Sequence, residues 1–443
     1  MMFFNNKTIV KTVLMAGGKG KRILSISSDV PKPMIKINNK PVLEYEIEYL
    51  RSQGFTDIII TVSHLASVIM DYFGDGGRFG VHINYYHEEP PLGNAGALFK
   101  IKDQLSDDFL LLNADAIFNI DLNRFVSFHR MRGGLATLFT HPNNHPYDSG
   151  LIIADKNGTV QQWLTKEDER PEFYKNRVNG GLHVIRRSLL DMIDGSRVGE
   201  LDDDGHIIKI DLDRQILKPL AGTGKMFCYD SPEYVKEMGT PERLRQVVSD
   251  FETGKIQARS LRNKQKAVFL DRDGTINKYV GFLRKSDELE LIDGAAEAIR
   301  KINESGYLAI VVTNQPVIAR GEVTGDELET IHNKMETLLG QEGAYLNGIY
   351  YCPHHPDKGF DGEIKELKIE CGCRKPKPGM LIKASEDFNI DLSQSWMIGD
   401  SENDILAGKS AGCKTALIGK DSGLFGQDVC VANLKEFVDM YLQ

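Results

Sequence analysis

Short apolar runs alternate with amphipathic stretches along both halves of this chain. The runs have the length of buried strands, and the stretches between them repeat apolar residues at helical spacing. An alternation of β and α elements predicts mostly parallel sheets covered by helices, so we expect an α/β fold in each half. The predicted strands cover residues 10–15, 57–62 and 109–112 in the first half and residues 267–270, 308–312 and 396–398 in the second.

The length of 443 residues exceeds one ordinary domain, because a domain commonly holds roughly 100 to 200 residues. The stretch FETGKIQARSLRNKQ is polar, basic and low in large apolar residues. We therefore predict a first domain over residues 1–250, a linker over 251–265 and a second domain over 266–443. A helix over residues 241–251 is expected to close the first domain, which would shorten the linker to a few residues.

Composition and charge narrow the classes of partner. The net charge of −9 provides no broad cationic surface, so we expect neither nucleic acid nor an anionic membrane as a partner. No apolar run approaches the roughly 20 residues of a membrane span, and Lys7 and Lys11 interrupt the apolar residues at the start, unlike a signal peptide. A cytoplasmic protein is expected. The sequence does not determine the oligomeric state, and a homo-oligomer is one of the open alternatives.

A glycine-rich stretch follows the first predicted strand. The sequence AGGKGKR ends at Arg22, and Lys32 stands between two prolines ten residues later. Glycine permits positive φ and lets phosphate oxygens approach bare backbone amides. The loop begins where a strand ends, which is where α/β sheets bind ligands. This pattern indicates a phosphate site, and a tight turn with solvated basic residues is the alternative.

Two aspartates, Asp271 and Asp273, directly follow the predicted strand over residues 267–270. Their spacing lets both carboxylates turn into one crevice once the strand ends. One carboxylate can attack phosphorus while the other acts as acid and base, which is the division of labour that covalent phosphate hydrolysis requires. Thr313 and Asn314 end the next strand, where a hydroxyl could hold the phosphoryl group. An ordinary acidic turn is the alternative.

Four residues further along the second half have the chemistry of zinc ligands. Cys352 and His354 are separated by one residue, as are Cys371 and Cys373. Four such ligands fit a closed tetrahedral Zn²⁺ site, which would be structural because no coordination position stays open. Free cysteines are the alternative reading, and His355 is the alternative imidazole. The remaining cysteines, Cys228, Cys413 and Cys430, are expected in the core.

The first half resembles the sugar nucleotidyltransferases, whose fold is Rossmann-like and similar to that of GT-A enzymes. The resemblance rests on the glycine-rich loop with PKP, EEPPLGNAGAL, NAD at Asp115, NGG at Asn179 and EMGTPE at Glu237. It implies Mg²⁺ at Asp115 and Glu237 and catalytic roles for Arg22 and Lys32. It also implies nucleotide-binding and sugar-binding residues, which are Ala16, Gly17, Gly18, Gly93, Asn94 and Asp115 for the nucleotide and Asn179, Gly180 and Lys166 for the sugar.

Three departures from that pattern matter. Lys21 stands where the family often has threonine, which adds positive charge near the phosphates. Thr165 precedes Lys166 where a glutamate is common. Glu237 replaces an aspartate and is one methylene longer, which alters the geometry available to a metal. Asp115 as a strand-end cap and Glu237 as a residue at a helix start are the alternatives to metal binding.

The second half resembles the haloacid dehalogenase superfamily, and within it the heptose bisphosphate phosphatases, which have a zinc loop and a minimal cap. DRDGTIN, TNQ with IARG, CPHHP, CGCRKPKPGM and GDSENDI carry the resemblance. It implies an aspartyl-phosphate at Asp271, an acid at Asp273 and a stabilising cation at Lys375. It places Mg²⁺ at Asp271, Asp400 and the Asp273 carbonyl, with Asp404 as a support of Asp400 or a solvated helix start.

In that family, the segment from Tyr279 to Phe282, the residues Asn314 and Gln315, and Arg374 would contact the sugar bisphosphate. This chain has proline and valine at 316 and 317 where the family usually has serine and glycine. The substrate loop after Gln315 is therefore expected to be reshaped.

Together the two halves imply two consecutive steps. The phosphatase would remove the 7-phosphate of D-glycero-α-D-manno-heptose 1,7-bisphosphate, and the transferase would join the resulting 1-phosphate to GMP from GTP, releasing pyrophosphate. Such a transfer needs positioning and charge stabilisation by Mg²⁺ rather than a protein nucleophile. The alternatives are a uridylyl- or cytidylyltransferase for another sugar joined to a related phosphatase, and a non-catalytic nucleotide-sugar-binding first half.

Overall fold

The structure, a computed structural model, describes residues 10–18, 30–419 and 425–442. The chain forms two compact units. Unit 1 comprises Met1–Thr140, Ile152–Trp163 and Asn179–Gln257, and unit 2 comprises His141–Leu151, Leu164–Val178 and Ala258–Gln443. Unit 2 is therefore assembled from three separate stretches of sequence, two of which come from the first half of the chain.

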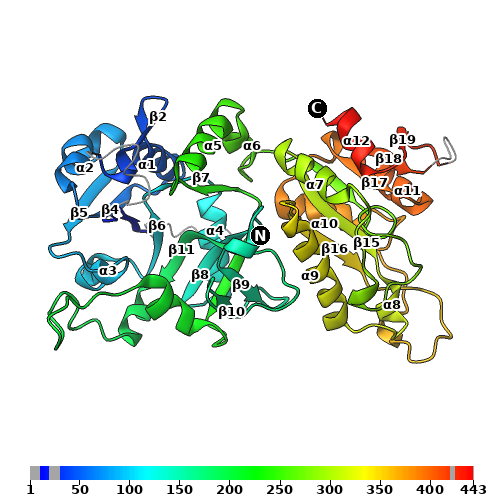
Figure 1. The fold of residues 1–443 in the computed structure, drawn as a ribbon, viewed down its shortest axis with the longest axis horizontal. Coiled ribbons are helices and arrows are strands. Elements are labelled where there is room, and N and C mark those ends of the chain that lie inside the picture. Colours follow the sequence, from blue (N-terminus) through cyan, green and yellow to red (C-terminus); the bar gives the residue numbers. More distant parts are fainter. Residues whose placement is uncertain (1–9, 19–29, 420–424, 443) are drawn as a thin grey trace. The chain divides into compact units, whose positions relative to one another are not determined.

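Unit 1 is built on a large mixed sheet (Figure 1). The strand order is β10-β9-β11-β6-β1-β4-β5, with β8 beside β11 and β12 beside β8. The strands β1, β4, β5 and β6 are parallel, and β11 runs antiparallel to β6. The strands of this sheet are β1 Thr12–Met15, β4 Asp57–Val62, β5 His82–His87, β6 Asp108–Asn113, β8 Ala136–His141, β9 Leu151–Ala154, β10 Val160–Leu164, β11 Val178–Arg186 and β12 Met226–Asp230.

Successive residues of the central strands of unit 1 point into two apolar cores on opposite faces of the sheet. Leu14 and Ile60 pack in one core, and Val13 and Ile59 pack in the other. Because both faces are covered, these strands are continuous apolar runs rather than alternating ones. The helices of this part are α1 Val42–Ser52, α2 Ala66–Phe73, α3 Gly96–Lys100, α4 Leu122–Arg132 and α5 Pro241–Glu252.

Unit 2 contains a parallel sheet with the order β16-β15-β14-β17-β18-β19 (Figure 1). One face packs against α7, α9 and α12, and the other packs against α10 and α11. The strands are β14 Ala267–Leu270, β15 Leu308–Asn314, β16 Gly348–Cys352, β17 Trp396–Gly399, β18 Lys414–Ile418 and β19 Val429–Val431. The helices are α7 Ala295–Glu304, α8 Pro316–Ala319, α9 Gly325–Gln341, α10 Gly379–Phe388, α11 Glu402–Ala411 and α12 Leu434–Tyr441. The α/β fold expected from the apolar pattern is confirmed in both units.

The two early segments of unit 2 pack against helix α9. The backbone N–H of Tyr174 donates to Thr337 Oγ1 at 2.9 Å, and that of Asn176 donates to Glu336 Oε2 at 2.9 Å. Arg177 pairs with the same Glu336 carboxylate at 3.3 Å, and both side chains are buried. Residues from the first half therefore complete the buried surface of α9.

The stretch predicted as a linker is folded. Helix α5 extends to Glu252, and α6 covers Lys255–Ala258. Ile256, Ser260 and Gln265 are buried. All six cysteines are free thiols, with Cys228 and Cys413 buried and Cys430 partly exposed. None of the helices in the described ranges is long and apolar enough to cross a membrane.

The Glu336 carboxylate makes a testable contribution to stability. Glu336→Ala should lower the free energy of unfolding of unit 2 by about 3–5 kcal/mol, because it removes the acceptor that a buried guanidinium and a buried amide share. Urea unfolding followed by Trp396 fluorescence measures this in a Trp163→Phe background, since the two tryptophans lie one in each unit.

A matched control for this experiment is Glu304→Ala, which removes an exposed carboxylate paired with Arg300 at 3.4 Å. Exposed pairs contribute at most about 1 kcal/mol. A loss at Glu336 no larger than the loss at Glu304 would contradict the assigned role.

Candidate active sites

Three neighbouring strands of unit 2 end at one edge of the sheet and bring their functional groups together. The strand β14 lies between β15 and β17, with Leu270 opposite both Val311 and Ile398. Asp271 follows β14, Thr313 lies near the end of β15, and Asp400 follows β17. Parallel strands present their carboxyl ends on the same side, which is where such sheets bind ligands.

Lys375 is the buried cation of this edge. Its side chain is 2% exposed, and its Nζ lies 2.9 Å from Asp271 Oδ1 and 2.5 Å from Asp404 Oδ1. The ammonium also donates to the Val312 carbonyl at 2.8 Å. Burial opposes its charge, but the two carboxylates raise the pKa of Lys375 above its ordinary value. Burial raises the pKa of Asp271, and Lys375 works against that rise.

Asp404 is fully buried and has two roles at once. Its Oδ2 accepts from the hydroxyl of Ser401 at 2.6 Å and from the Ser401 backbone N–H at 3.1 Å, which caps helix α11. Its other oxygen binds Lys375. Asp404 is therefore a helix cap that also fixes the buried cation of Lys375, rather than a solvated residue at the start of a helix.

Asp273 is held as a carboxylate by three polar side chains. Arg272 Nη2 donates to its Oδ2 at 2.8 Å, Gln315 Nε2 to the same oxygen at 3.1 Å, and Asn277 Nδ2 to Oδ1 at 3.0 Å. Burial works against ionisation, but Arg272 and these hydrogen bonds hold the pKa of Asp273 below its ordinary value. Gln315 also donates to Thr313 Oγ1 at 2.9 Å, so it links the acid to the hydroxyl.

The carboxylates of Asp271, Asp400 and Asp404 form a candidate cation site. One oxygen from each lies within 4.8 Å of the others. Burial and Asp404 raise the pKa of Asp400 to about 6. Gly274, at φ 80°, permits this crowding, because a Cβ there would lie 2.0 Å from Asp400 Oδ2. Three clustered oxygen donors suit a hard divalent cation.

Several residues predicted to bind substrate have other contacts here. The Asn314 side chain exchanges two 3.0 Å hydrogen bonds with the backbone of Lys375 and so positions that lysine. Gln315 is engaged with Asp273 and Thr313. Arg374 donates to the His354 carbonyl at 3.2 Å. Tyr279 and Phe282 are exposed on the loop that follows Asp271 and Asp273. Proline and valine at 316 and 317 start helix α8, and the expected reshaping of this loop stays a prediction.

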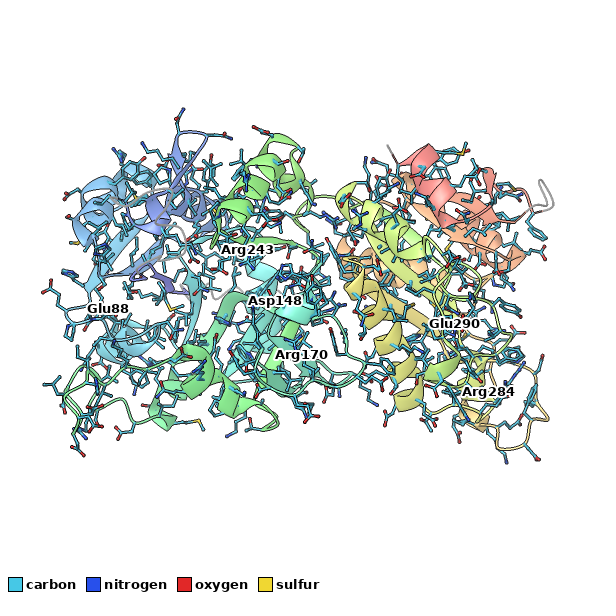
Figure 2. All side chains as sticks on the ribbon, viewed as in Figure 1. Glu88, Asp148, Arg170, Arg243, Arg284 and Glu290 are labelled. Carbon is cyan, nitrogen blue, oxygen red and sulfur yellow. The ribbon has the colours of Figure 1, made fainter. Side chains whose placement is uncertain are left out.

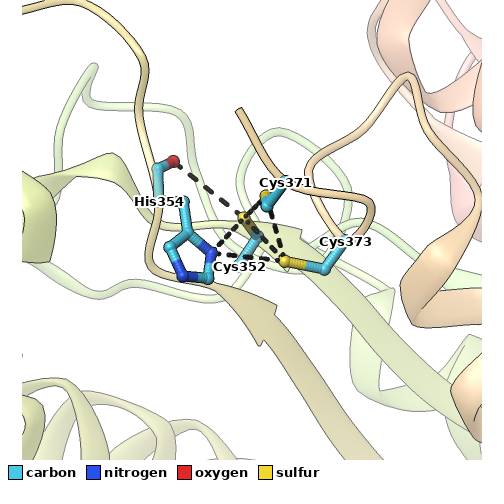
Figure 3. Close-up of side chains that lie close together, drawn as sticks. All are labelled: Cys352, His354, Cys371 and Cys373. Atoms are coloured by element: carbon cyan, nitrogen blue, oxygen red, sulfur yellow. Dashed lines mark hydrogen bonds between the residues drawn. The ribbon is translucent and has the colours of Figure 1, made fainter. Parts of the chain in front are cut away.

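The four predicted zinc ligands come together in unit 2 (Figure 3). The three sulfur atoms of Cys352, Cys371 and Cys373 lie 3.2 to 3.5 Å apart. His354 Nδ1 lies 3.7 Å from Cys352 Sγ and 3.4 Å from Cys373 Sγ. The edges of a tetrahedron around zinc measure about 3.8 Å for sulfur, because Zn–S bonds are about 2.3 Å. His355 lies outside this cluster and accepts from the Asp357 backbone.

In unit 1, Lys32 lies between the two predicted metal ligands. Its Nζ binds Asp115 Oδ2 and lies 3.3 Å from Glu237 Oε1. Strand β13 Tyr234–Glu237 pairs with β7 Ala116–Asn119, and this pairing sets Glu237 beside Ala116. Arg243, labelled in Figure 2, holds the second Glu237 oxygen at 3.3 Å. Two carboxylates that converge on a cation form a suitable place for Mg²⁺.

The glycine loop of unit 1 is described as far as Gly18, so Lys19, Lys21 and Arg22 lie outside the described residues. Ala16 donates its N–H to the Thr61 carbonyl at 2.9 Å. A Cβ on Gly17 would lie 3.1 Å from Glu88 Oε1, so the loop runs directly against this buried acid, which is labelled in Figure 2. Glu88 Oε2 accepts from the Leu92 backbone at 2.9 Å.

Gly93 and Asn94 shape the next loop. A Cβ on Gly93 would lie 2.4 Å from the Ile210 carbonyl, and its φ of 89° also favours glycine. Asn94 Oδ1 accepts from the Leu212 backbone at 2.7 Å, so this side chain ties the loop to residues 210–212.

The residues predicted for the sugar lie in two places. Asn179 accepts from the Gly181 N–H at 3.2 Å and, with Gly180, lies on β11, next to Asn113 at the end of β6. Lys166 belongs to a segment of unit 2 and pairs with Asp148 at 2.6 Å, with both side chains exposed.

Glu46 is a residue that the sequence analysis missed. It lies on α1, is fully buried, and its Oε1 accepts from the Ala116 N–H at 3.2 Å. Burial and the charge of Asp115 raise the pKa of Glu46 well above its ordinary value. Nothing in the helical pattern around position 46 marks it, because the contact forms only when α1 packs beneath the Asp115 turn.

Comparisons with known proteins agree with the two sites. Residues 11–213 match the nucleotidyl transferase family, and residues 212–412 match the haloacid dehalogenase-like hydrolase family. The chain is 45% identical over 157 residues to the D-glycero-beta-D-manno-heptose-1,7-bisphosphate 7-phosphatase of Pasteurella multocida (strain Pm70), which covers 35% of this chain and 82% of that protein. The Escherichia coli (strain K12) protein of the same name is 43% identical over 152 residues, covering 34% and 78%.

Among solved structures, HddC from Yersinia pseudotuberculosis is similar with a TM-score of 0.46 and 22% identity, covering 55% of this chain and 99% of that one. The expected pairing of a transferase with a phosphatase is confirmed by the family matches. The chain is therefore a two-part enzyme with a nucleotidyltransferase domain in its first half, and through its second half it belongs to the heptose-1,7-bisphosphate 7-phosphatase family of haloacid dehalogenase-like hydrolases.

Proposed function

We propose that this enzyme makes GDP-heptose in two steps. The second half would hydrolyse the 7-phosphate of D-glycero-α-D-manno-heptose 1,7-bisphosphate, and the first half would transfer GMP from GTP to the remaining 1-phosphate. The observation that carries the proposal is the cluster of Asp271, Lys375 and Asp404 at the carboxyl edge of the sheet. It lies in a region 45% identical to a protein named for the 7-phosphatase reaction.

In the phosphatase step, an oxygen of Asp271 attacks the 7-phosphorus and the bond from phosphorus to the sugar oxygen breaks. Asp273 gives that oxygen a proton and then takes one from the water that hydrolyses the aspartyl-phosphate. Asp273 starts as a carboxylate paired with Arg272, and the negative charge of an arriving phosphate favours its protonation. Lys375 favours the ionised form of Asp271 and would neutralise charge on the phosphoryl group.

We propose Mg²⁺ at both sites and Zn²⁺ at the third cluster. Asp271, Asp400 and the Asp273 carbonyl would hold one Mg²⁺, and Asp115 with Glu237 would hold the other. When bound, Mg²⁺ supplies positive charge next to the reacting phosphates. Cys371 and Cys373 lie directly before Arg374 and Lys375, and Cys352 ends β16, so zinc would tie this loop to the sheet and take no part in the reaction.

Nucleotidyl transfer in the first half needs no covalent intermediate. An oxygen of the sugar 1-phosphate attacks the α-phosphorus of GTP in line, and pyrophosphate leaves. Lys32, which is 8% exposed between Asp115 and Glu237, would stabilise charge at the reacting phosphorus. We assign Gly17, Gly18 and Arg22 to the triphosphate, Gly93 and Asn94 to the nucleoside, and Asn179, Gly180 and Lys166 to the sugar.

The anomer of the substrate is the most specific part of this proposal. The similar phosphatases are named for the beta anomer. We propose the α-anomer, because the fused transferase resembles the guanylyltransferases that use it rather than the smaller adenylyltransferases that use the β-anomer. We also propose domains over residues 1–250 and 266–443 and a location in the cytoplasm, where free thiols such as these persist.

The proposal is tested with synthetic α- and β-heptose 1,7-bisphosphate, each given with Mg²⁺ and GTP, ATP, UTP or CTP. We expect phosphate release and GDP-heptose from the α-anomer. Equal processing of the β-anomer into a nucleotide sugar would overturn the anomer assignment. Phosphate release with no nucleotide sugar would favour a non-catalytic first half, and no phosphate release would refute the heptose substrate.

Two single substitutions should separate the two activities. Asp115→Ala should abolish pyrophosphate release and leave phosphate release unchanged. Asp404→Asn should lower phosphatase kcat by roughly 100-fold, because a misplaced Lys375 no longer meets the transition state, and should leave nucleotidyl transfer unchanged. Each variant is the folding control for the other, and a loss of both activities in either one would contradict the separate sites.

The zinc proposal is tested by metal analysis of the purified full chain. We expect about one zinc per chain in the wild type, as a closed four-ligand site binds one ion. Cys373→Ser should lose it, whereas Cys413→Ser, at a buried thiol outside the cluster, should retain it. Equal zinc content in the two variants would refute the site.

A further inference from the structure

Arg320 carries a guanidinium group clamped between two aromatic rings. Its Cζ lies 4.1 Å from the ring centre of Phe282 and 4.5 Å from that of Phe360. Such stacking fixes the plane of the guanidinium and leaves its N–H edge available. Among the described residues the Arg320 side chain donates no hydrogen bond, and its Nε is buried without a partner. A fork of donors is thus held in place with no acceptor from the described chain.

The acidic residues around Arg320 are engaged by other cations. Glu322 binds Arg284, labelled in Figure 2, at 2.7 Å. Glu363 pairs with Lys368 at 3.6 Å and accepts from two backbone amides of its own loop. Lys368 also lies 4.5 Å from the Phe360 ring, on which Arg320 stacks. Positive charge is therefore in excess at this place.

Arg320 lies close to the phosphatase site. It ends helix α8, whose N-cap is Gln315, the residue that contacts Asp273 and Thr313. Helix α8 is a single short turn of four residues, Pro316–Ala319, so little chain separates Gln315 from Arg320. Phe282, on which Arg320 stacks, lies on the loop that starts at Asn277, which also binds Asp273. Both segments that hold the guanidinium therefore begin at side chains that contact Asp273.

The backbone around Arg320 is held rigidly. Val317 and Ile318 of α8 pack with Leu367 of the zinc loop. The Ile364 N–H donates to the Ala319 carbonyl at 3.0 Å. A Cβ on Gly321 would lie 1.9 Å from the Gly362 carbonyl, so the two loops touch directly. A preorganised donor loses little conformational entropy when it binds a ligand.

We propose that Arg320 binds the phosphate group of the substrate that is not hydrolysed. This inference rests on the proposed phosphatase function and names the residue that selects a bisphosphate over a monophosphate. The planar fork matches two phosphate oxygens, and such bidentate charge-assisted bonds are among the strongest in proteins. Phe282 and Phe360 hold the fork and offer apolar faces to the sugar.

The test compares the full-length wild type with Arg320→Gln on two substrates, heptose 1,7-bisphosphate and heptose 7-phosphate. The inference predicts a fall of roughly 10- to 100-fold in kcat/KM for the bisphosphate, the scale of a lost hydrogen bond to a charged group. The monophosphate value stays within about twofold. Arg320→Lys keeps the charge without the planar fork, so its kcat/KM for the bisphosphate should lie between those of the wild type and Arg320→Gln.

The matched control is Arg300→Gln, which removes an exposed arginine of α7 that pairs with Glu304. It should leave both substrates unchanged. An equal loss on both substrates in Arg320→Gln would mean that Arg320 only supports the loops, and no loss on either would mean that the second phosphate binds elsewhere. Both results would overturn the inference.

Failure of the heptose assignment is distinguishable from failure of this inference. If the wild type hydrolyses neither heptose bisphosphate, the proposed function is wrong. Arg320 is then judged by inhibition of p-nitrophenyl phosphate hydrolysis by fructose 1,6-bisphosphate and by fructose 6-phosphate. The inference predicts that Arg320→Gln weakens inhibition by the bisphosphate at least tenfold more than inhibition by the monophosphate, and equal changes would overturn it.

Discussion

The buried ammonium group of Lys375 allows the carboxylates of Asp271 and Asp404 to lie close together at the edge of the sheet. Asp404 is fully buried and the Asp271 side chain is only 13% exposed, and without a cation between them their repulsion and the loss of hydration would keep at least one of them protonated. Lys375 lies within 2.9 Å of both. The ion triad ties the end of β14 to the start of α11, so Asp271 is positioned by the same contacts that hold the sheet edge together.

Unit 1 also has a lysine between two carboxylates. Asp115 and Glu237 are brought together by the pairing of β7 with β13, and Lys32 from the proline-framed turn neutralises them. The proline on each side of Lys32 restricts the backbone and so limits where the ammonium can go. Next to this cluster, the buried Glu46 accepts a hydrogen bond from the Ala116 N–H, and burial together with the charge of Asp115 raises its pKa.

The parts of the sites that depend on the position of residues along the chain could be predicted from the sequence. Apolar runs located the strands, and functional residues directly after a strand must share one edge of a parallel sheet, which explains why Asp271, Thr313 and Asp400 could be predicted. The cluster of Cys352, His354, Cys371 and Cys373 follows from spacing and ligand chemistry in the same way. Contacts between distant segments could not be predicted. Tertiary packing alone produces the contact of Asp404 with Lys375, the hydrogen bond from Gln315 to Asp273 and the burial of Glu46. The polar composition of residues 251–265 predicted a linker, but this stretch is folded and contains buried side chains.

The discontinuous make-up of unit 2 has a consequence for the order of events during synthesis. Tyr174 and Asn176 leave the ribosome about 160 residues before their partners Thr337 and Glu336. These early segments cannot reach their final environment until α9 has been translated, however soon the strands around them have formed. If the chain were cut near residue 258, the early segments of unit 2 would remain on the N-terminal fragment. The C-terminal fragment would then hold Glu336 without the Asn176 amide and the Arg177 guanidinium that it binds in the intact enzyme.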